Sequence, residues 1–234
     1  MATETWGTGA EVDNAITVYG SPERDTTFIS PPVYGESWAT LLSGAGNGTG
    51  SSIAPSVYCG GYPGSAEFWK KMEKCIFVAD TSGLSAETIN SATVGIYVIG
   101  AQEGDAGYSI GLYGASPANE ASIAAADYNN IDGSWADPKT LASLTGNAWH
   151  TFTIPAVNID KSGNTCFAII YTAHGGWNWQ GGGLISASAI KLSVTYNAAP
   201  ATDLASKKGL AYADLANAKG LDRADLSYLK GVAL

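Results

Sequence analysis

The sequence predicts an all-β chain, an antiparallel β-sandwich followed by a short C-terminal appendage of helical 11-residue repeats. Short apolar stretches recur at spacings of roughly 10–20 residues, and the body shows no long helical period. Glycine occurs 29 times and charged residues make up only 14% of the 234 residues, which suits strands joined by tight turns. The apolar fraction of 45% is sufficient for a buried core.

Residues 1–70 show the weakest pattern in the chain. Short apolar pieces at 15–19 and 27–29 are separated by proline and glycine, and no long element is predicted from them. The segment GAGNGTGSS at 44–52 has the composition of a mobile loop. Asn47-Gly48-Thr49 matches a glycosylation acceptor, which we interpret as loop chemistry because no secretory signal is recognised.

Clear strands are predicted from residue 74 onward. The apolar run at 74–79 is typical of a strand buried on both faces, and the DTSG sequence after it predicts a turn. Alternation predicts strands at 91–99 and 189–196, and shorter strands follow at 108–113, 149–154 and 165–171. The residues of the two alternating strands that are predicted to point inward are Ala92, Val94, Ile96, Val98, Ile190, Leu192, Val194 and Tyr196.

The chain ends in three copies of one 11-residue unit, at 201–211, 212–222 and 223–233. The NAAP sequence at 197–200 marks the boundary between a sandwich domain at 1–199 and a repeat tail at 200–234. In each unit an aspartate can cap a short helix, and a Lys-Gly pair can end it. One continuous helix is the alternative, but a glycine inside it, at Gly209 and again at Gly220, would cost about 1 kcal/mol each time.

Each unit of the tail presents two apolar residues that one helical turn cannot bury by itself. A single turn is also unstable alone because helix nucleation is unfavourable. We therefore predict that the tail anchors the chain or makes it oligomerise. The predicted assembly residues are Leu204, Leu210, Leu215, Leu221, Leu226 and Val232.

The formal net charge of −9 lies in the body, because the tail carries five basic and four acidic residues. A nucleic-acid partner is not expected, since phosphate binding requires a lysine- and arginine-rich surface. Membrane insertion is not expected either, because no stretch approaches the ~20 apolar residues of a membrane span. Of the three cysteines, Cys75 and Cys166 lie in apolar runs and are expected to be buried thiols.

Three segments of the body resemble a family of jelly-roll modules: FVADTSGLSAETINSATVGIYV, SIAAADYNNIDGSWAD, and WHTFTIP with NIDKSGNTCFAIIY. The resemblance covers about 75–196 and departs from the family at Ala79-Asp80 and at HGGWNWQGGG. It implies a jelly-roll sandwich of the kind found in tailed-bacteriophage virion proteins and in secreted bacterial and archaeal proteins. Such modules serve in display or binding, and the tail is similar to short repeats that end phage structural proteins.

Two groups of residues are candidate ligand sites. Asp127, Asn129 and Asp132 carry oxygens that suit a structural calcium, and a turn held by its own hydrogen bonds is the alternative. The Gly-rich loop after 165–171 carries aromatic and amide side chains that can stack on a sugar and hydrogen-bond to it. Contact with a neighbouring subunit is the alternative for this loop, whose candidate residues are Tyr171, His174, Trp177, Asn178 and Trp179.

No pattern in the sequence predicts catalysis. The acidic residues are scattered, a G-x-S-x-G motif is absent, and His150 is expected to pack rather than act as a base. We therefore expect a structural virion protein of a bacteriophage. It would be a decoration, fibre or appendage module that is attached to the particle, or to its own oligomer, through the C-terminal repeat tail. A glycan-binding module of an extracellular or cell-surface protein is the alternative.

The expected partners are further copies of this chain, other virion proteins and surface glycans. The protein would be made in the host cytoplasm and reside in the virion. No cofactor is expected apart from the candidate calcium.

Overall fold

The computed structural model describes residues 1–8, 12–16, 18–25, 35–49, 56–61, 69–85, 87–103, 107–173 and 182–197. At 56–61, 101–103 and 182–188 it describes the backbone alone. The chain divides into two units, Met1–Asn197 and Ala198–Leu234. The second unit, with all six predicted assembly residues, lies outside the described residues, so the fold below is that of the first unit.

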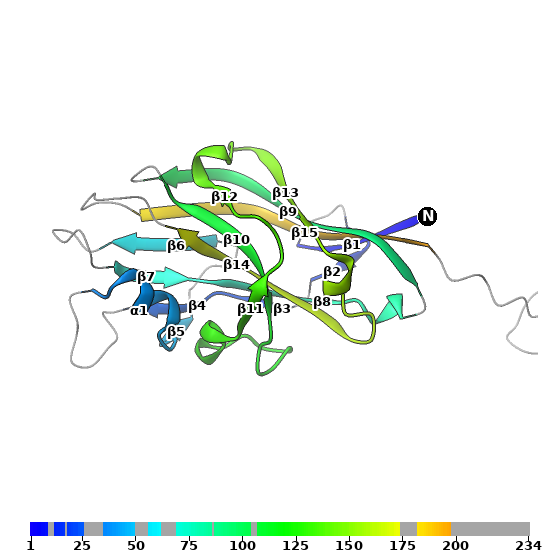
Figure 1. The fold of residues 1–234 in the computed structure, drawn as a ribbon, viewed down its shortest axis with the longest axis horizontal. Helices are drawn as coiled ribbons and strands as arrows, with labels where there is room; N and C mark the ends of the chain where they lie inside the picture. Colours follow the sequence, from blue (N-terminus) through cyan, green and yellow to red (C-terminus); the bar gives the residue numbers. More distant parts are fainter. Residues whose placement is uncertain are drawn as a thin grey trace, which may run out of the picture. The chain divides into compact units, whose positions relative to one another are not determined.

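The larger of two β-sheets contains nine strands (Figure 1). Its order is β13-β9-β15-β6-β7-β4-β5, with β1 paired to β15 and to β2. All of these pairings are antiparallel except the short parallel contact between β1 and β2. The strands are β1 (Ala2–Gly7), β2 (Asn14–Ala15), β4 (Pro22–Asp25), β5 (Gly48–Thr49), β6 (Ser56–Gly61), β7 (Trp69–Glu73), β9 (Thr88–Glu103), β13 (Ala148–Ile154) and β15 (Gly182–Asn197).

The smaller sheet contains six strands in the order β11-β10-β14-β8-β3, with β12 paired to β10. Its strands are β3 (Val18–Gly20), β8 (Cys75–Asp80), β10 (Ser109–Ala115), β11 (Ile131–Ser134), β12 (Lys139–Thr140) and β14 (Asn164–Ala173). The described residues contain one short α-helix, α1 (Trp38–Ser43), and 3-10 turns that include η2 (Ser82–Leu84), η3 (Ala125–Asn129) and η5 (Ala156–Asn158). The predicted all-β, antiparallel sandwich is confirmed.

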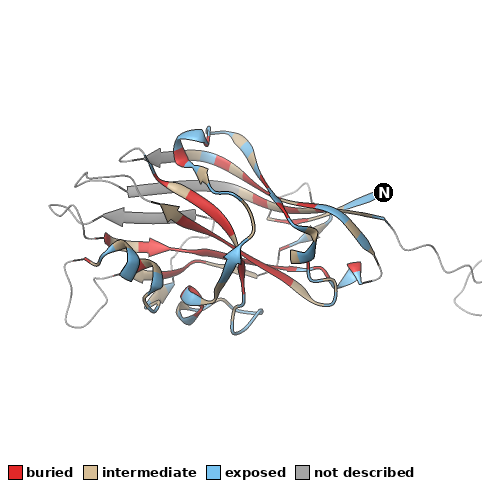
Figure 2. Cartoon of the chain, viewed as in Figure 1, coloured by how far each residue is buried: buried red, intermediate tan, exposed pale blue. Residues whose placement is uncertain are grey.

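The main core lies between the inner faces of the two sheets. On β9 the inward residues Ala92, Val94, Ile96 and Val98 are buried, and on β15 Ile190, Leu192 and Val194 are buried. Tyr196 packs against the same core and is partly buried. The predicted inward faces of both strands are therefore confirmed, and Figure 2 shows the resulting alternation of buried and exposed residues along β13 and β9.

Strand β8 is buried on both faces, as its continuous apolar sequence predicts. Phe77 faces the main core, whereas Ile76 and Val78 belong to a second cluster on the other face of the smaller sheet. Ile123, from the segment between β10 and β11, and Ile131, from β11 itself, pack against this second cluster. The predicted buried thiols are also confirmed: Cys75 and Cys166 are buried and free, and burial raises the pKa of each to about 12.

The described part of the predicted mobile loop at 44–52 is ordered, which corrects that expectation. Gly48 and Thr49 form β5 against β4. The Asn47 amide accepts a hydrogen bond from the Asp25 N–H at 2.9 Å and donates one to the Asp25 carbonyl at 2.8 Å. These side chain-to-backbone bonds join segments more than 20 residues apart, and composition alone does not reveal them. Within the described residues, no helix is long and apolar enough to cross a membrane.

Candidate functional site

Four neighbouring strands of the larger sheet, β13, β9, β15 and β1, present one continuous surface away from the main core. Their inward residues are buried, so alternate residues point outward. We call this surface the outer face. It consists of Trp149, Thr151 and Thr153 on β13, Ser91, Thr93, Gly95 and Tyr97 on β9, Lys191, Ser193 and Thr195 on β15, and Thr3, Thr5 and Gly7 on β1.

Hydroxyl groups form rows across the outer face, because each of its strands carries a Ser/Thr-x-Thr sequence. The strand register aligns Thr153, Thr93, Ser193 and Thr5 in one row. Since adjacent strands lie ~4.8 Å apart, this row extends ~14 Å across the sheet. Thr5 Oγ1 donates a hydrogen bond of 2.9 Å to Asp13, whereas the other three hydroxyls of the row have no side-chain hydrogen bond to any described residue.

Trp149 is one of two aromatic side chains on the outer face, and it is 45% exposed. The register places Trp149 opposite Tyr97, and the two rings meet edge to face with centroids 5.5 Å apart. Gly95 provides space for the indole, because a Cβ atom there would lie 3.2 Å from the Trp149 ring. A partly exposed, flat ring is thereby held against the sheet by two neighbouring residues of β9.

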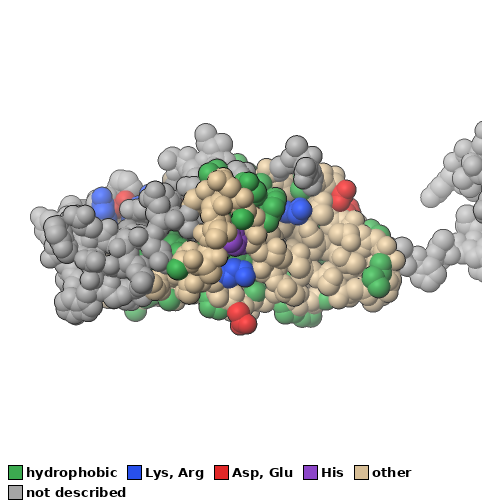
Figure 3. Space-filling view, turned by 90° about the horizontal axis from the view of Figure 1, so that it is seen from above, with side chains coloured by type: hydrophobic (Ala, Val, Ile, Leu, Met, Phe, Trp, Pro, Cys, Tyr) green, Lys and Arg blue, Asp and Glu red, His purple; other side chains and the backbone are tan. Residues whose placement is uncertain are grey.

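Lys191 reaches from β15 across Gly95 toward the same ring. Its ammonium lies 5.0 Å from the centroid of Trp149, a cation–π distance. In the register Lys191 is opposite Gly95 on one side and Gly7 on the other, so neither neighbour supplies a carboxylate. Figure 3, which views the molecule from above, shows hydrophobic, basic and acidic side chains on a surface that is mainly uncharged.

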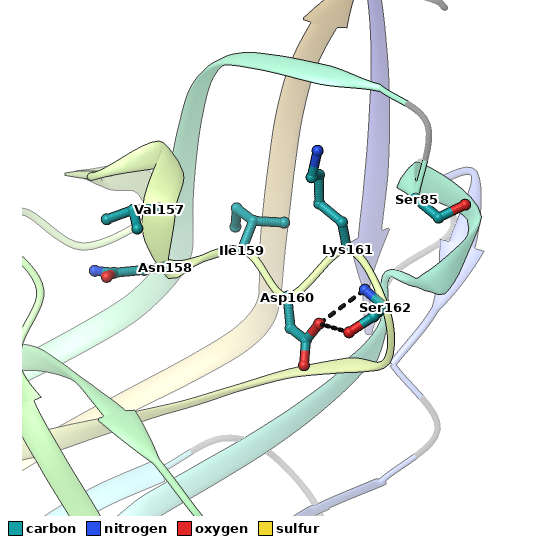
Figure 4. A pocket seen from close by; sticks show the side chains of 7 residues that line it. All are labelled: Ser85, Val157, Asn158, Ile159, Asp160, Lys161 and Ser162. Atoms are coloured by element: carbon teal, nitrogen blue, oxygen red, sulfur yellow. Dashed lines mark hydrogen bonds between the residues drawn. The ribbon is translucent and has the colours of Figure 1, made fainter.

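A shallow pocket of ≈ 510 Å³ lies beside η5 and is lined by Ser85, Val157, Asn158, Ile159, Asp160, Lys161 and Ser162 (Figure 4). Its charged groups already have protein partners. Asp160 accepts hydrogen bonds from the Ser162 N–H and hydroxyl, both at 2.8 Å, and Lys161 donates one to the Glu87 carbonyl at 2.8 Å. The Asp160 and Lys161 side chains point in different directions, so they do not converge on a common ligand position.

The structure describes one residue of the aromatic site that the sequence predicts. Tyr171 is fully buried and packs edge to face against Tyr108, with ring centroids 5.9 Å apart. It belongs to the core because it lies on the inward side of β14, which corrects its expected place in an exposed sugar site. His174, Trp177, Asn178 and Trp179 lie outside the described residues, and their role stays a prediction.

The residues predicted for calcium lie close in sequence but have separate protein partners. Asp127 is 1% exposed and accepts hydrogen bonds from the N–H groups of Ala118 and Ala124, both at 2.8 Å, and from the Asn130 amide at 2.9 Å. Asn129 donates a hydrogen bond to the Ser43 carbonyl at 2.9 Å, and Asp132 accepts one from Ser116 at 2.7 Å. These bonds favour the alternative interpretation, a turn held by its own hydrogen bonds.

Hydrogen bonding also sets the ionisation of Asp127. Burial by itself would raise the pKa of this carboxyl, but the hydrogen bonds from Ala124, Ala118 and Asn130 lower it, and the resulting pKa is below the ordinary value. Among the described residues, no group of three His, Cys, Asp or Glu side chains is placed to hold a metal ion. Calcium binding at Asp127, Asn129 and Asp132 stays a prediction.

A depression of ≈ 470 Å³ brings Tyr171, Asn129 and Asp132 together, with Lys74 among its lining residues. Lys74 is 3% exposed and donates hydrogen bonds to the carbonyls of Leu42 at 2.8 Å and Tyr128 at 2.9 Å. Its ammonium also lies 3.8 Å from the centroid of the Tyr128 ring. Because Lys74, Asn129 and Asp132 already have protein partners, the outer face is the stronger candidate site.

The chain matches no protein-family model and no curated protein. Among solved structures it is similar to a mutant of Xylanase10C from Cellvibrio japonicus in complex with xylopentaose. The identity is 14% and the TM-score is 0.30, and the match covers 64% of this chain and 27% of the xylanase chain. It is also similar to a carbohydrate-binding module of the β-sandwich superfamily, with 12% identity, a TM-score of 0.24, and coverage of 62% of this chain and 54% of that one. Likenesses this weak carry no argument about function.

Proposed function

We propose that this chain is a non-catalytic carbohydrate-binding module whose outer face holds a glycan. The observation that carries the proposal is the Trp149 ring, 45% exposed on a sheet surface lined with hydroxyl groups. A flat indole suits the apolar face of a pyranose ring, and the surrounding hydroxyls can donate hydrogen bonds to sugar oxygens or accept them from sugar hydroxyls. Such a combination of an aromatic surface with a few directional polar groups is typical of binding sites.

The outer face is also suited to binding because little has to rearrange. Trp149 is positioned by Tyr97 and Gly95, and strand pairing on both sides fixes β9 and β15. Side chains held in this way lose little conformational entropy when a ligand binds. The hydroxyls of Thr93, Thr153 and Ser193 have no side-chain partner among the described residues, so no described side chain competes with a ligand for them.

The test compares wild-type protein with Trp149→Ala on an array of glycans, followed by titration calorimetry with the best ligand. We expect the substitution to weaken binding about tenfold, equivalent to about 1.4 kcal/mol. Val157→Ala is the matched control, because Val157 is also apolar and exposed but lies on η5. If wild type binds no glycan, or if Trp149→Ala binds as tightly as wild type, the proposal is wrong.

A second candidate function is that of a bacteriophage structural protein, attached to the particle or to its own oligomer through the tail. The three 11-residue units at 201–233 favour it, together with the resemblance of 75–196 to virion jelly-roll modules. The two functions are compatible, since a displayed module can also bind a glycan. Burying one leucine contributes about 1.5–3 kcal/mol, so six apolar anchors can hold a subunit firmly.

The test of the second candidate is deletion of 201–234. We expect a soluble, folded domain of 1–200 that no longer oligomerises or joins a particle, and we expect Leu215→Ser with Leu226→Ser to have the same effect. Sedimentation measures the oligomer, and mass spectrometry of purified particles measures incorporation. A truncated chain that misfolds, beside a full-length chain that is a stable monomer, would show that the tail belongs to the core.

A further inference from the structure

We infer that the glycan bound at the outer face carries an anionic group, a carboxylate or a sulfate ester, that pairs with Lys191. This inference rests on the proposed function and adds the class of ligand. Lys191 places a positive charge 5.0 Å from the centroid of the ring on which a sugar would stack. An acidic substituent on a sugar stacked on Trp149 would therefore come within reach of the ammonium.

No described residue neutralises this lysine. Its two neighbours in the strand register, Gly95 and Gly7, have no side chains, and none of the residues that make up the outer face is acidic. Asp13 contacts the outer face at Thr5, but it accepts hydrogen bonds there from the Thr5 N–H at 2.8 Å and the Thr5 hydroxyl at 2.9 Å. Lys191 has no ion pair with any described residue, in a chain whose formal net charge is −9.

Other lysines of the body have different surroundings. Lys71 pairs with Glu23 at 2.5 Å and with Glu73 at 2.9 Å. Lys161 donates a hydrogen bond to a backbone carbonyl at 2.8 Å. The contact described for Lys191 is with the aromatic ring of the candidate site, so its charge is available to a ligand at that site.

The positive charge of Lys191 should decide whether the outer face prefers acidic glycans over neutral ones. An ammonium can form a charge-assisted hydrogen bond to a carboxylate or a sulfate, which is about twice as strong as a neutral one. The acidic body as a whole repels a polyanion, so attraction depends on this local pairing and weakens as salt screens it. A neutral glycan would still stack on Trp149 and bond to the hydroxyl rows, but it would gain nothing from Lys191.

The test uses two pairs of polysaccharides that differ only in charge: polygalacturonate with its methyl ester, and dextran sulfate with dextran. The variants are Lys191→Met, which keeps the apolar stem, and Lys191→Arg, which keeps the charge. Lys139→Met is the control, because Lys139 also lies over an aromatic ring, Phe152, at 5.3 Å, but belongs to the smaller sheet. Affinity electrophoresis measures the dissociation constant of each combination.

We expect wild type to prefer at least one acidic polysaccharide over its neutral counterpart by about tenfold, and Lys191→Met to abolish that preference. Lys191→Arg and Lys139→Met should keep it. Whether the carboxylate or the sulfate is preferred identifies the anionic group. Equal binding of acidic and neutral counterparts, or a preference that survives Lys191→Met, overturns the inference. If the inference is overturned but Trp149→Ala still weakens glycan binding, the proposed function stands. If wild type binds none of these polysaccharides and no glycan on the array, the inference and the proposed function are both wrong.

Discussion

Replacing Asp127 with alanine should strongly destabilise the body. The carboxylate is 1% exposed and accepts three hydrogen bonds, from the N–H groups of Ala118 and Ala124 and from the Asn130 amide. These bonds hold the segment between β10 and β11, from which Ile123 packs against the second cluster of the smaller sheet. Each hydrogen bond to a charged group contributes about 1.5–3 kcal/mol, and the alanine variant leaves its donors without an acceptor.

We expect Asp127→Ala to lower the free energy of unfolding by about 3–5 kcal/mol at pH 7, because burial of the carboxylate offsets part of the gain. Urea denaturation followed by tryptophan fluorescence measures this loss. Asp127→Asn should lose less, since its amide oxygen can still accept hydrogen bonds, although its NH₂ group cannot accept from an N–H donor. A loss below about 1 kcal/mol for the alanine variant would refute the role assigned to these bonds.

The same carboxylate predicts a dependence on pH. The pKa of Asp127 is lower in the folded chain than its ordinary value, so the unfolded chain binds more protons at acidic pH. Its contribution is therefore complete above about pH 5 and is lost as the pH falls through the folded pKa. The difference in stability between wild type and Asp127→Asn should shrink as the pH falls from 5 toward about 3. A constant difference would contradict the assignment.

Three further predictions concern the core, a buried lysine and calcium. Val194→Asp should leave the chain insoluble or unfolded, because Val194 is 0% exposed and the new carboxylate would be buried without a partner. Thr195→Asp, on the other side of β15, should remain soluble and folded. Circular dichroism distinguishes the two outcomes. Burial lowers the pKa of Lys74 from 10.5 to about 8, so the stability of wild type relative to Lys74→Met should rise with pH from 8 to 10.5, as the difference between their urea midpoints would show. Adding calcium should leave the melting temperature of the wild-type protein unchanged. If calcium instead raises it, and Asp132→Asn abolishes that rise, the result supports the predicted calcium site.

The strands with regular apolar patterns were predictable from sequence because their environment follows directly from alternation. Residues 75–79 are apolar throughout, and the strand that contains them, β8, contacts one cluster on each face. The strands β4 and β7 gave no such signal. Their sequences, PERD and WKKME, are rich in charge, yet Glu23 and Glu73 are buried. Lys71 pairs with Glu73 of its own strand and with Glu23 of β4, and the second of these contacts joins segments far apart in the chain.

The candidate site was less accessible to sequence analysis than the fold. Alternation in 149–154 indicates that Trp149 points outward, but it does not reveal which residues lie beside it. The outer face forms only when four strands from separate parts of the chain pair in the observed register. This register places the Thr3 and Thr195 hydroxyl oxygens 3.0 Å apart. The repeated Ser/Thr-x-Thr sequence at 3–5, 91–93, 151–153 and 193–195 was the available signal. Tyr171 could have been excluded from an exposed site, because alternation along 165–171 places it in phase with the buried Phe167 and Ile169.

The most direct test of the outer face as a glycan site is a titration of ¹⁵N-labelled protein with its best glycan ligand, followed by nuclear magnetic resonance. Our account predicts the largest shifts at the Trp149 indole N–H and at the backbone amides of 91–97, 149–153 and 191–195, with saturation at the calorimetric dissociation constant. The amides of β8 and β14 in the smaller sheet should stay unchanged. Shifts confined to 174–181, with none at Trp149, would contradict the account and favour the aromatic loop that the sequence predicts.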